Sequence, residues 1–237
     1  MASLRQIRRR LRSTQSTKQV MRAMQLVSGS KLKRAQGRLL QGRQMLEFLD
    51  GLLQRVLAAS PTMEHPLCRT GTGPSGTSPL PGALLVITSD PGLAGSYNAN
   101  LIQLAEAELR RDTAKRTEVS YVGKRGHRYF TKRGYAAKDA HLDLAGRPDP
   151  VKIDAIGKVL MDRFLAGQIS SVRLLYAKFV SPTVSKPTMK QWLPIQLDSA
   201  TGPLGHWATR AGEYIFEPSL KRVFEDLLPR WTLATFR

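Results

Sequence analysis

The chain has 237 residues, of which 41% are hydrophobic, so it is long enough to form a large domain with a real core. Its 37 lysine and arginine residues outnumber 18 acidic residues, which gives a formal net charge of +19. This excess predicts a polyanionic partner: nucleic acid, an anionic membrane or an acidic protein surface. The single cysteine, Cys68, excludes an internal disulfide framework. Because no apolar signal core follows Met1 and no window is apolar enough to span a bilayer, we expect a soluble, cytoplasmic protein.

Residues 3–58 contain no proline and predict one unusually long helix, roughly 80 Å at about 1.5 Å per residue. Its apolar or small residues recur at alternating intervals of three and four, which predicts a heptad seam and requires a partner helix. The seam consists of Leu32, Ala35, Leu39, Leu46, Leu49, Leu53 and Val56. Glycines at four positions of this helix predict close packing or a local bend, since each costs up to ~1 kcal/mol relative to alanine. They are Gly29, Gly37, Gly42 and Gly51.

The charges of this helix are almost all positive. It carries 13 basic residues and only two acidic ones, Glu47 and Asp50, a net charge of +11. An ordinary basic run is often only a solvated helix face, but two acids are too few to compensate the cations at i,i+4 spacing. The helix is therefore predicted to bind an anionic partner.

A compact domain is predicted after a Pro-, Gly-, Ser- and Thr-rich segment, residues 60–81, which has the composition of a flexible linker. Strands alternate with helices there, which predicts a right-handed parallel α/β layer. The expected strands are 82–89, 117–123 and 171–181, with 189–197 pairing at the edge, and the expected helices are 98–112, 124–133 and 150–166.

A last helix is predicted to open at Pro218. Its apolar residues form a second heptad seam, Leu220, Phe224, Leu227, Trp231 and Ala234. The predicted fold class is α/β: long N- and C-terminal helices that form an antiparallel coiled coil, with a central Rossmann-like α/β domain. The predicted boundaries are 1–58 for the first helix, 59–81 for the linker, 82–212 for the α/β domain and 213–237 for the last helix.

Four separated blocks, residues 3–36, 89–101, 122–135 and 213–218, resemble the gamma subunits of F-type ATP synthases, the central-stalk family. The first block carries the most specific matches: Ile7–Arg8, Ser13, Thr17–Lys18, Ala23–Met24, Val27–Ser28 and Lys31. The chain departs from the family where Pro91 replaces the usual arginine and Ala94 the usual cysteine. The family's last helix also continues for tens of residues beyond the position of Arg237. A final helix of 20 residues, about 30 Å, is therefore expected to cover only the C-terminal third of the first helix.

The resemblance implies a non-catalytic rotor subunit of the proton-translocating ATP synthase, which couples rotation of a membrane ring to ATP synthesis in the catalytic head. The implied partners are the alpha, beta and epsilon subunits and the ring of c subunits. The implied location is peripheral, on the cytoplasmic face of the bacterial plasma membrane. Rotor–stator contacts are implied for Lys18, Arg22, Met24 and Lys31, and contacts between the foot and the ring for Arg34, Arg38, Tyr214, Phe216 and Glu217.

Other functional interpretations have weaker support. The loop Asp90–Ser96 invites phosphate binding at a helix N-terminus, but it has neither a dinucleotide nor a Walker sequence, so a structural turn is preferred. His65, His127, His141 and His206 form no metal-ligand pattern. We therefore expect no catalytic constellation, no metal and no cofactor. The alternative function is a nucleic-acid-binding protein that clamps phosphates with the basic helix, although residues 3–36 contain no aromatic platform.

Overall fold

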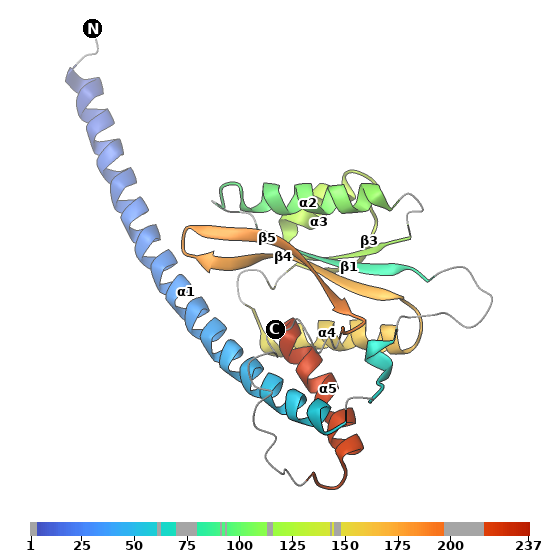
Figure 1. Ribbon diagram of the computed structural model, residues 1–237. Coiled ribbons are helices and arrows are strands. Elements are labelled where there is room, and N and C mark those ends of the chain that lie inside the picture. The colour runs from blue at the N-terminus through green and yellow to red at the C-terminus, as the bar shows by residue number, and fades with distance from the viewer. Residues whose placement is uncertain are drawn as a thin grey trace. The chain divides into compact units, whose positions relative to one another are not determined.

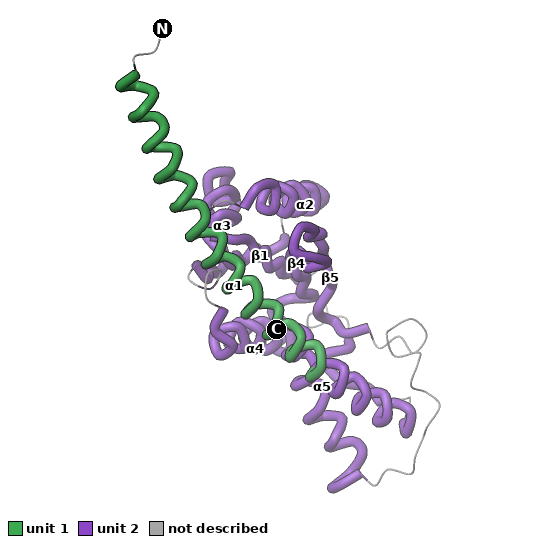
Figure 2. The backbone as a smooth tube through the Cα atoms, turned by 90° about the vertical axis from the view of Figure 1, so that its left-hand side faces the viewer, with its two compact units in different colours: residues 1–45 green, residues 46–237 purple. Residues whose placement is uncertain are grey.

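A computed structural model describes residues 4–60, 63–69, 80–90, 92, 94–112, 116–142, 144, 148–196 and 216–237. The chain divides into two compact units, residues 1–45 and residues 46–237 (Figure 2). The predicted long helix is a single element, α1 (Leu4–Ala59), of 56 residues. The other elements, in order, are η1 (Pro66–Cys68), β1 (Gly82–Ile87), α2 (Tyr97–Arg111), β2 (Glu118–Val122), α3 (Lys124–Thr131), β3 (Ala137–His141), α4 (Pro150–Leu165), β4 (Ser171–Ser181), β5 (Val184–Leu193) and α5 (Leu220–Phe236).

The second unit contains a five-stranded sheet with strand order β3-β2-β1-β4-β5. The first four strands in this order pair in parallel, and β4 and β5 form an antiparallel hairpin at one edge. A parallel sheet that grows outward in both directions from β1 is the Rossmann-like arrangement that the sequence predicts. The expected edge pairing at 189–197 exists, although β5 begins earlier. The strand β3 was not predicted, because its five residues are mostly polar and exposed.

Helices cover both faces of this sheet (Figure 1). On one face, α2 and α3 pack through Leu101 and Phe130 against Leu84, Val86 and Tyr121 of the strands. The opposite face, with Leu85 and Leu174, packs against α4, α5 and the last turns of α1 in one larger core cluster. Alternate residues of β1 thus point into different cores, as the period of a strand requires.

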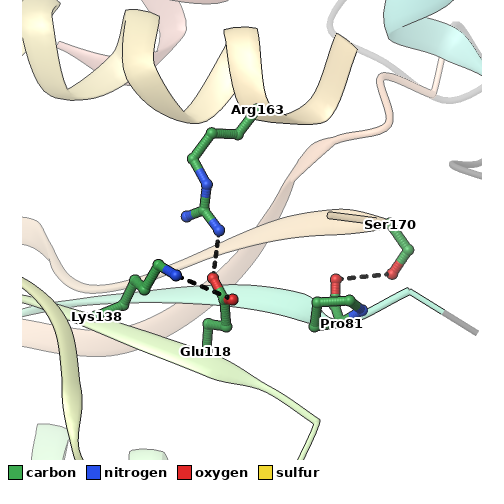
Figure 3. Close-up of polar contacts among 5 residues, drawn as sticks. All are labelled: Pro81, Glu118, Lys138, Arg163 and Ser170. Carbon is green, nitrogen blue, oxygen red and sulfur yellow. Dashed lines mark hydrogen bonds and ion pairs between the residues drawn. The ribbon is translucent and has the colours of Figure 1, made fainter. Parts of the chain in front are cut away.

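The amino ends of the strands are held by polar contacts (Figure 3). Glu118, at the start of β2, accepts a hydrogen bond from Arg163 of α4, and its other oxygen lies 3.5 Å from Nζ of Lys138 on β3. The Ser170 hydroxyl, just before β4, donates to the carbonyl of Pro81 before β1 at 3.3 Å, as Figure 3 shows, and the Ser170 N–H donates to the same carbonyl at 2.9 Å. These contacts join four strands and α4 at the amino ends of the strands.

Only the last residues of the predicted heptad seam of α1 are buried. Leu49, Leu53 and Val56 are buried, and Leu46 is half-buried. Within the first unit, Leu32 and Leu39 are 38% and 39% exposed. In Figure 1, α5 runs opposite to the end of α1, and its 17 residues span only about 25 Å. Within the second unit, α5 contacts the end of α1 through the Trp231–Asp50 hydrogen bond and the shared core cluster, and the share of α1 that α5 covers stays a prediction.

The C-terminal helix departs from its prediction in two respects. It begins after Ser219, whose side chain accepts a hydrogen bond from the Arg222 N–H, and not at Pro218. Its buried residues are Phe224, Leu228 and Thr232, at intervals of four. Of the predicted seam residues, only Phe224 is fully buried, and the others are half-buried. The heptad pattern failed here because α5 packs on α4 and against Trp192 of β5 as well as on the end of α1.

Trp192 of β5 anchors α5 to the α/β domain. Its indole N–H donates to the Thr232 carbonyl at 3.1 Å and to the Thr235 hydroxyl at 3.2 Å, and its ring lies 4.8 Å from that of Phe236. The predicted linker also contains a docked segment, residues 63–69. Leu67 in it is fully buried, and its carbonyl accepts a hydrogen bond from the Ile195 N–H. Residues 63–69 therefore do not form a flexible linker, although their composition predicted one.

The glycines of α1 have open space around them. A Cβ atom built on Gly29, Gly37, Gly42 or Gly51 meets no heavy atom within 4 Å among the described residues. The expectation of close packing within the chain is wrong at these positions, so an intramolecular contact does not explain them.

Candidate functional site

The first unit presents an uncompensated cationic surface. Residues 4–45 of α1 contain 12 lysine and arginine residues and no acidic residue. All 12 are exposed, and none forms an ion pair with any residue that the structure describes. The two acidic residues of α1, Glu47 and Asp50, both belong to the second unit. The part of α1 in the first unit is therefore more strongly basic than the count for the whole helix indicates.

Several of these cations repel one another along the helix. Four like-charged pairs lie at i,i+4 spacing: Arg5 and Arg9, Arg8 and Arg12, Lys18 and Arg22, and Arg34 and Arg38. Each such pair destabilises a helix by about 0.2–0.5 kcal/mol. An anionic partner would remove this cost. The arginines between Arg5 and Arg12 were counted in the sequence prediction but not proposed as contacts, although their density is the clearest signal in the helix.

The predicted rotor–stator residues do not share one side of α1. At 3.6 residues per turn, Lys18 and Arg22 lie within about 40° of each other around the axis, and Met24 and Lys31 lie on the opposite side. Arg34 and Arg38, predicted for the foot, fall within about 80° of Met24 and Lys31. The cations thus surround the helix. Apolar residues between them are also exposed, including Met21 at 64% and Leu26 at 70%.

The predicted foot contacts in the second unit have different environments. Phe216 is half-buried and packs against the core of its own domain, whereas Glu217 is exposed. Tyr214 lies outside the described residues. The aromatic ring of Phe216 is therefore engaged within the chain.

The loop after β1 is built as a structural turn. The Asp90 carboxylate accepts from the Lys124 N–H at 3.2 Å, and the Thr88 hydroxyl accepts from the Gly126 N–H at 2.9 Å. Side chains of the chain itself thus bind two of the amides at the start of α3 and tie the end of β1 to that helix. Asn98 also accepts from the Ser89 N–H at 3.0 Å. Pro91, one of the departures from the family pattern, lies outside the described residues.

Gly123 closes this turn against β1 and was not singled out by sequence. It has a φ of +89°, and a Cβ atom there would lie 2.2 Å from the Thr88 carbonyl oxygen. Only glycine fits such a position. The signal was present in the third matched block, residues 122–135, where this glycine stands directly between a strand and a helix.

The described part of the chain contains neither a cluster of residues suited to hold a metal ion nor a helix long and apolar enough to cross a membrane. The structure thus defines an α/β-domain protein with a long, cationic N-terminal helix.

Comparison with known proteins identifies the family. A family model described as ATP synthase matches residues 3–236. The ATP synthase gamma chain of Pelotomaculum thermopropionicum is 34% identical over 231 residues, which cover 98% of this chain and 77% of the relative. That of Symbiobacterium thermophilum is 32% identical, with coverage of 97% and 76%. The Tetrahymena thermophila mitochondrial ATP synthase central stalk has a similar fold, with a TM-score of 0.62 at 21% identity over 92% of this chain and 89% of that chain.

The chain belongs to the ATP synthase family and, within it, to the gamma chains. The prediction from four sequence blocks is confirmed. Gamma chains are non-catalytic rotor subunits of the central stalk, so the chain is a stalk subunit of a membrane-associated complex and not an enzyme on its own. Nothing in the comparisons supports the alternative of nucleic-acid binding.

Proposed function

We propose that the first unit of this chain is the shaft surface that turns against the alpha and beta subunits, through Lys18, Arg22, Met24 and Lys31. The observation that carries the proposal is the set of 12 exposed cations without an intramolecular acidic partner. A cationic shaft inside an acidic sleeve is attracted without being locked, because each exposed ion pair contributes only about 0.2–1 kcal/mol. Contacts of this strength can be exchanged as the shaft moves between three equivalent positions.

In this proposal, ion flow turns the ring of c subunits, and the ring turns the α/β domain. Arg34, Arg38, Tyr214, Phe216 and Glu217 are the proposed contacts of this foot with the ring, and the epsilon subunit is the further stalk partner. Glu217 is the best placed of the described foot residues in the second unit, because it is exposed, whereas Phe216 is half-buried in its own core. The proposed location is the cytoplasmic face of the bacterial inner membrane.

The test compares two charge-reversed variants of the tagged full-length chain, co-expressed with the alpha, beta and epsilon subunits of its native complex. One is K18E/R22E on the shaft, and the other is K132E/K186E on exposed positions of the α/β domain, with the same change in net charge. We expect the shaft variant to retain about tenfold less alpha and beta subunit, from a loss of roughly 1.4 kcal/mol, and the control to match the wild type. Equal retention by both variants contradicts the proposed contact.

A second pair tests the foot. R34E/R38E is expected to weaken retention of the c ring without changing co-purification of the alpha and beta subunits. If this variant loses the head and keeps the ring, these two arginines belong to the shaft contact, and the proposed division of the helix is wrong.

A further inference from the structure

A cavity of about 420 Å³ lies between the sheet and α4 in the second unit, away from the residues proposed for rotation. Its apolar lining includes the buried residues Leu85, Leu144, Ile156 and Leu160, and the exposed Val159 at its mouth. Its size lies within the range of small-molecule sites, about 300–1,000 Å³. The rotor function described above makes no use of it.

Ser120 of β2 lines this cavity and is 6% exposed. It pairs with Leu85 of β1 in the sheet, so its hydroxyl occupies a core-facing position where the neighbouring strand carries an aliphatic side chain. No hydrogen bond to this hydroxyl occurs among the described residues. The hydroxyl oxygen remains accessible from the cavity, so a ligand atom in the cavity can take the place of water as its hydrogen-bond partner.

The rim of the cavity carries charged and titratable groups of both signs. Asp139 and His141 come from β3, and Lys152 comes from the first turns of α4. A rim of mixed sign selects a polar ligand without selecting its net charge. The combination of an apolar interior and one unpaired hydroxyl therefore favours an uncharged amphipathic molecule.

We propose that this cavity binds a small neutral molecule with an aromatic or branched hydrocarbon body and one hydroxyl group, which pairs with Ser120. Such a ligand would also bear on the packing of the C-terminal helix. The cavity is lined by Ile156 of α4, and at the next residue, Gly157, a Cβ atom would lie 3.0 Å from Leu233 of α5 and 3.1 Å from Phe236. Because α4 touches both the cavity and α5, occupancy stabilises the arrangement of these two helices, and binding to the folded state alone raises the melting temperature.

The test uses p-cresol and toluene as probes, which differ by one hydroxyl group, with the full-length chain labelled at its isoleucine and leucine methyl groups. We expect saturable NMR shifts at Ile156 and Leu160 with p-cresol. The variant S120A is expected to weaken p-cresol binding about fivefold, through the loss of one hydrogen bond, and to leave toluene binding unchanged. S185A, at an exposed position of β5, is the matched control and is expected to change neither.

A filling variant completes the test. A155F places a ring at the exposed mouth of the cavity and is expected to abolish binding of both probes, whereas A107F, exposed on α2 across the sheet, is expected to preserve it. Absence of saturable shifts, equal loss of both probes in S120A, or unchanged binding in A155F would overturn the proposal.

Discussion

The indole N–H of Trp231 on α5 donates a hydrogen bond to the carboxylate of Asp50 on α1. The two residues lie 181 positions apart in the sequence and join the end of the long helix to the C-terminal helix. Asp50 is one of only two acidic residues in α1, and both follow the cationic segment. Here the long helix bonds to its own chain, whereas the cations before residue 45 have no acidic partner among the residues that the structure describes.

Replacing Trp231 by phenylalanine is expected to reduce the free energy of unfolding by about 1–3 kcal/mol, because a part-buried carboxylate loses its donor. Urea denaturation measures the change. The double variant W231F/D50L should recover part of the loss, since it removes the orphaned carboxylate as well. If W231F alone leaves the midpoint unchanged, the bond contributes nothing to the junction of the two helices.

Acid sensitivity is expected from His65. Burial lowers the pKa of this imidazole below its ordinary value of 6.5, and the nearby Glu225 offsets the effect only in part. Its Nδ1 accepts the Leu67 N–H at 3.1 Å, which requires the neutral form. Since the unfolded chain binds the proton more readily, stability is fully present above pH 6.5 and falls as the pH drops below it towards the lowered pKa.

The variant H65N tests this expectation, because asparagine keeps an acceptor for Leu67 but does not titrate. Melting temperatures measured from pH 8 to pH 5 should fall less steeply for H65N than for the wild type, with similar values at pH 8. Parallel curves over this range would show that another group is responsible.

Two glycine-to-alanine substitutions are expected to act in opposite directions. G123A should destabilise the chain by about 3 kcal/mol or more, because it combines a positive φ with a steric overlap on Thr88. G37A in α1 meets open space and should stabilise the local helix by up to ~1 kcal/mol. Denaturation measures the first, and slower amide hydrogen exchange around residue 37 measures the second. A stabilising G123A would contradict the described turn.

The two ion pairs of Glu118, with Arg163 and with Lys138, are expected to contribute differently to the free energy of unfolding. Arg163 is 15% exposed at its side chain and Lys138 is 50% exposed. E118Q is expected to cost about 1–3 kcal/mol, because the enclosed guanidinium loses its charged acceptor. K138Q should cost no more than about 1 kcal/mol, as is usual for exposed pairs. Equal losses in thermal denaturation would mean that Arg163 gains nothing from its enclosure.

Much of the fold followed from periodicity and composition. The long helix was predictable because residues 3–58 lack proline, and β1 because its apolar run is too short for a helix. By contrast, β3 was missed because Lys138, Asp139 and Ala140 are exposed at the sheet edge and carry no apolar pattern. A strand of this kind is specified by its neighbour β2, and pairing with a neighbour is not visible in a local window.

The tail and the candidate sites show a second limit of sequence patterns. Leu220, Leu227 and Trp231 fit a heptad, but α5 buries Phe224, Leu228 and Thr232 because a sheet and α4 lie beside it. Similarly, Phe216 matched a family position, yet its partial burial in its own core depends on tertiary packing. Neither the cavity beside Ser120 nor its unpaired hydroxyl follows from spacing, since both arise where β2 meets α4.

The boundary near Met45 separates a segment that packs little within its own unit from one that contributes to the internal core. Residues after it must satisfy the internal core, as Leu49, Leu53 and Val56 do, whereas the described side chains before it are almost all solvent-exposed. Under the proposed function, substitutions in that leading segment act chiefly on contacts with the other subunits of the complex. Replacing residues 1–45 of one gamma chain by those of another should allow the hybrid to assemble with the alpha and beta subunits of the donor. The remainder of the recipient chain should fold unchanged.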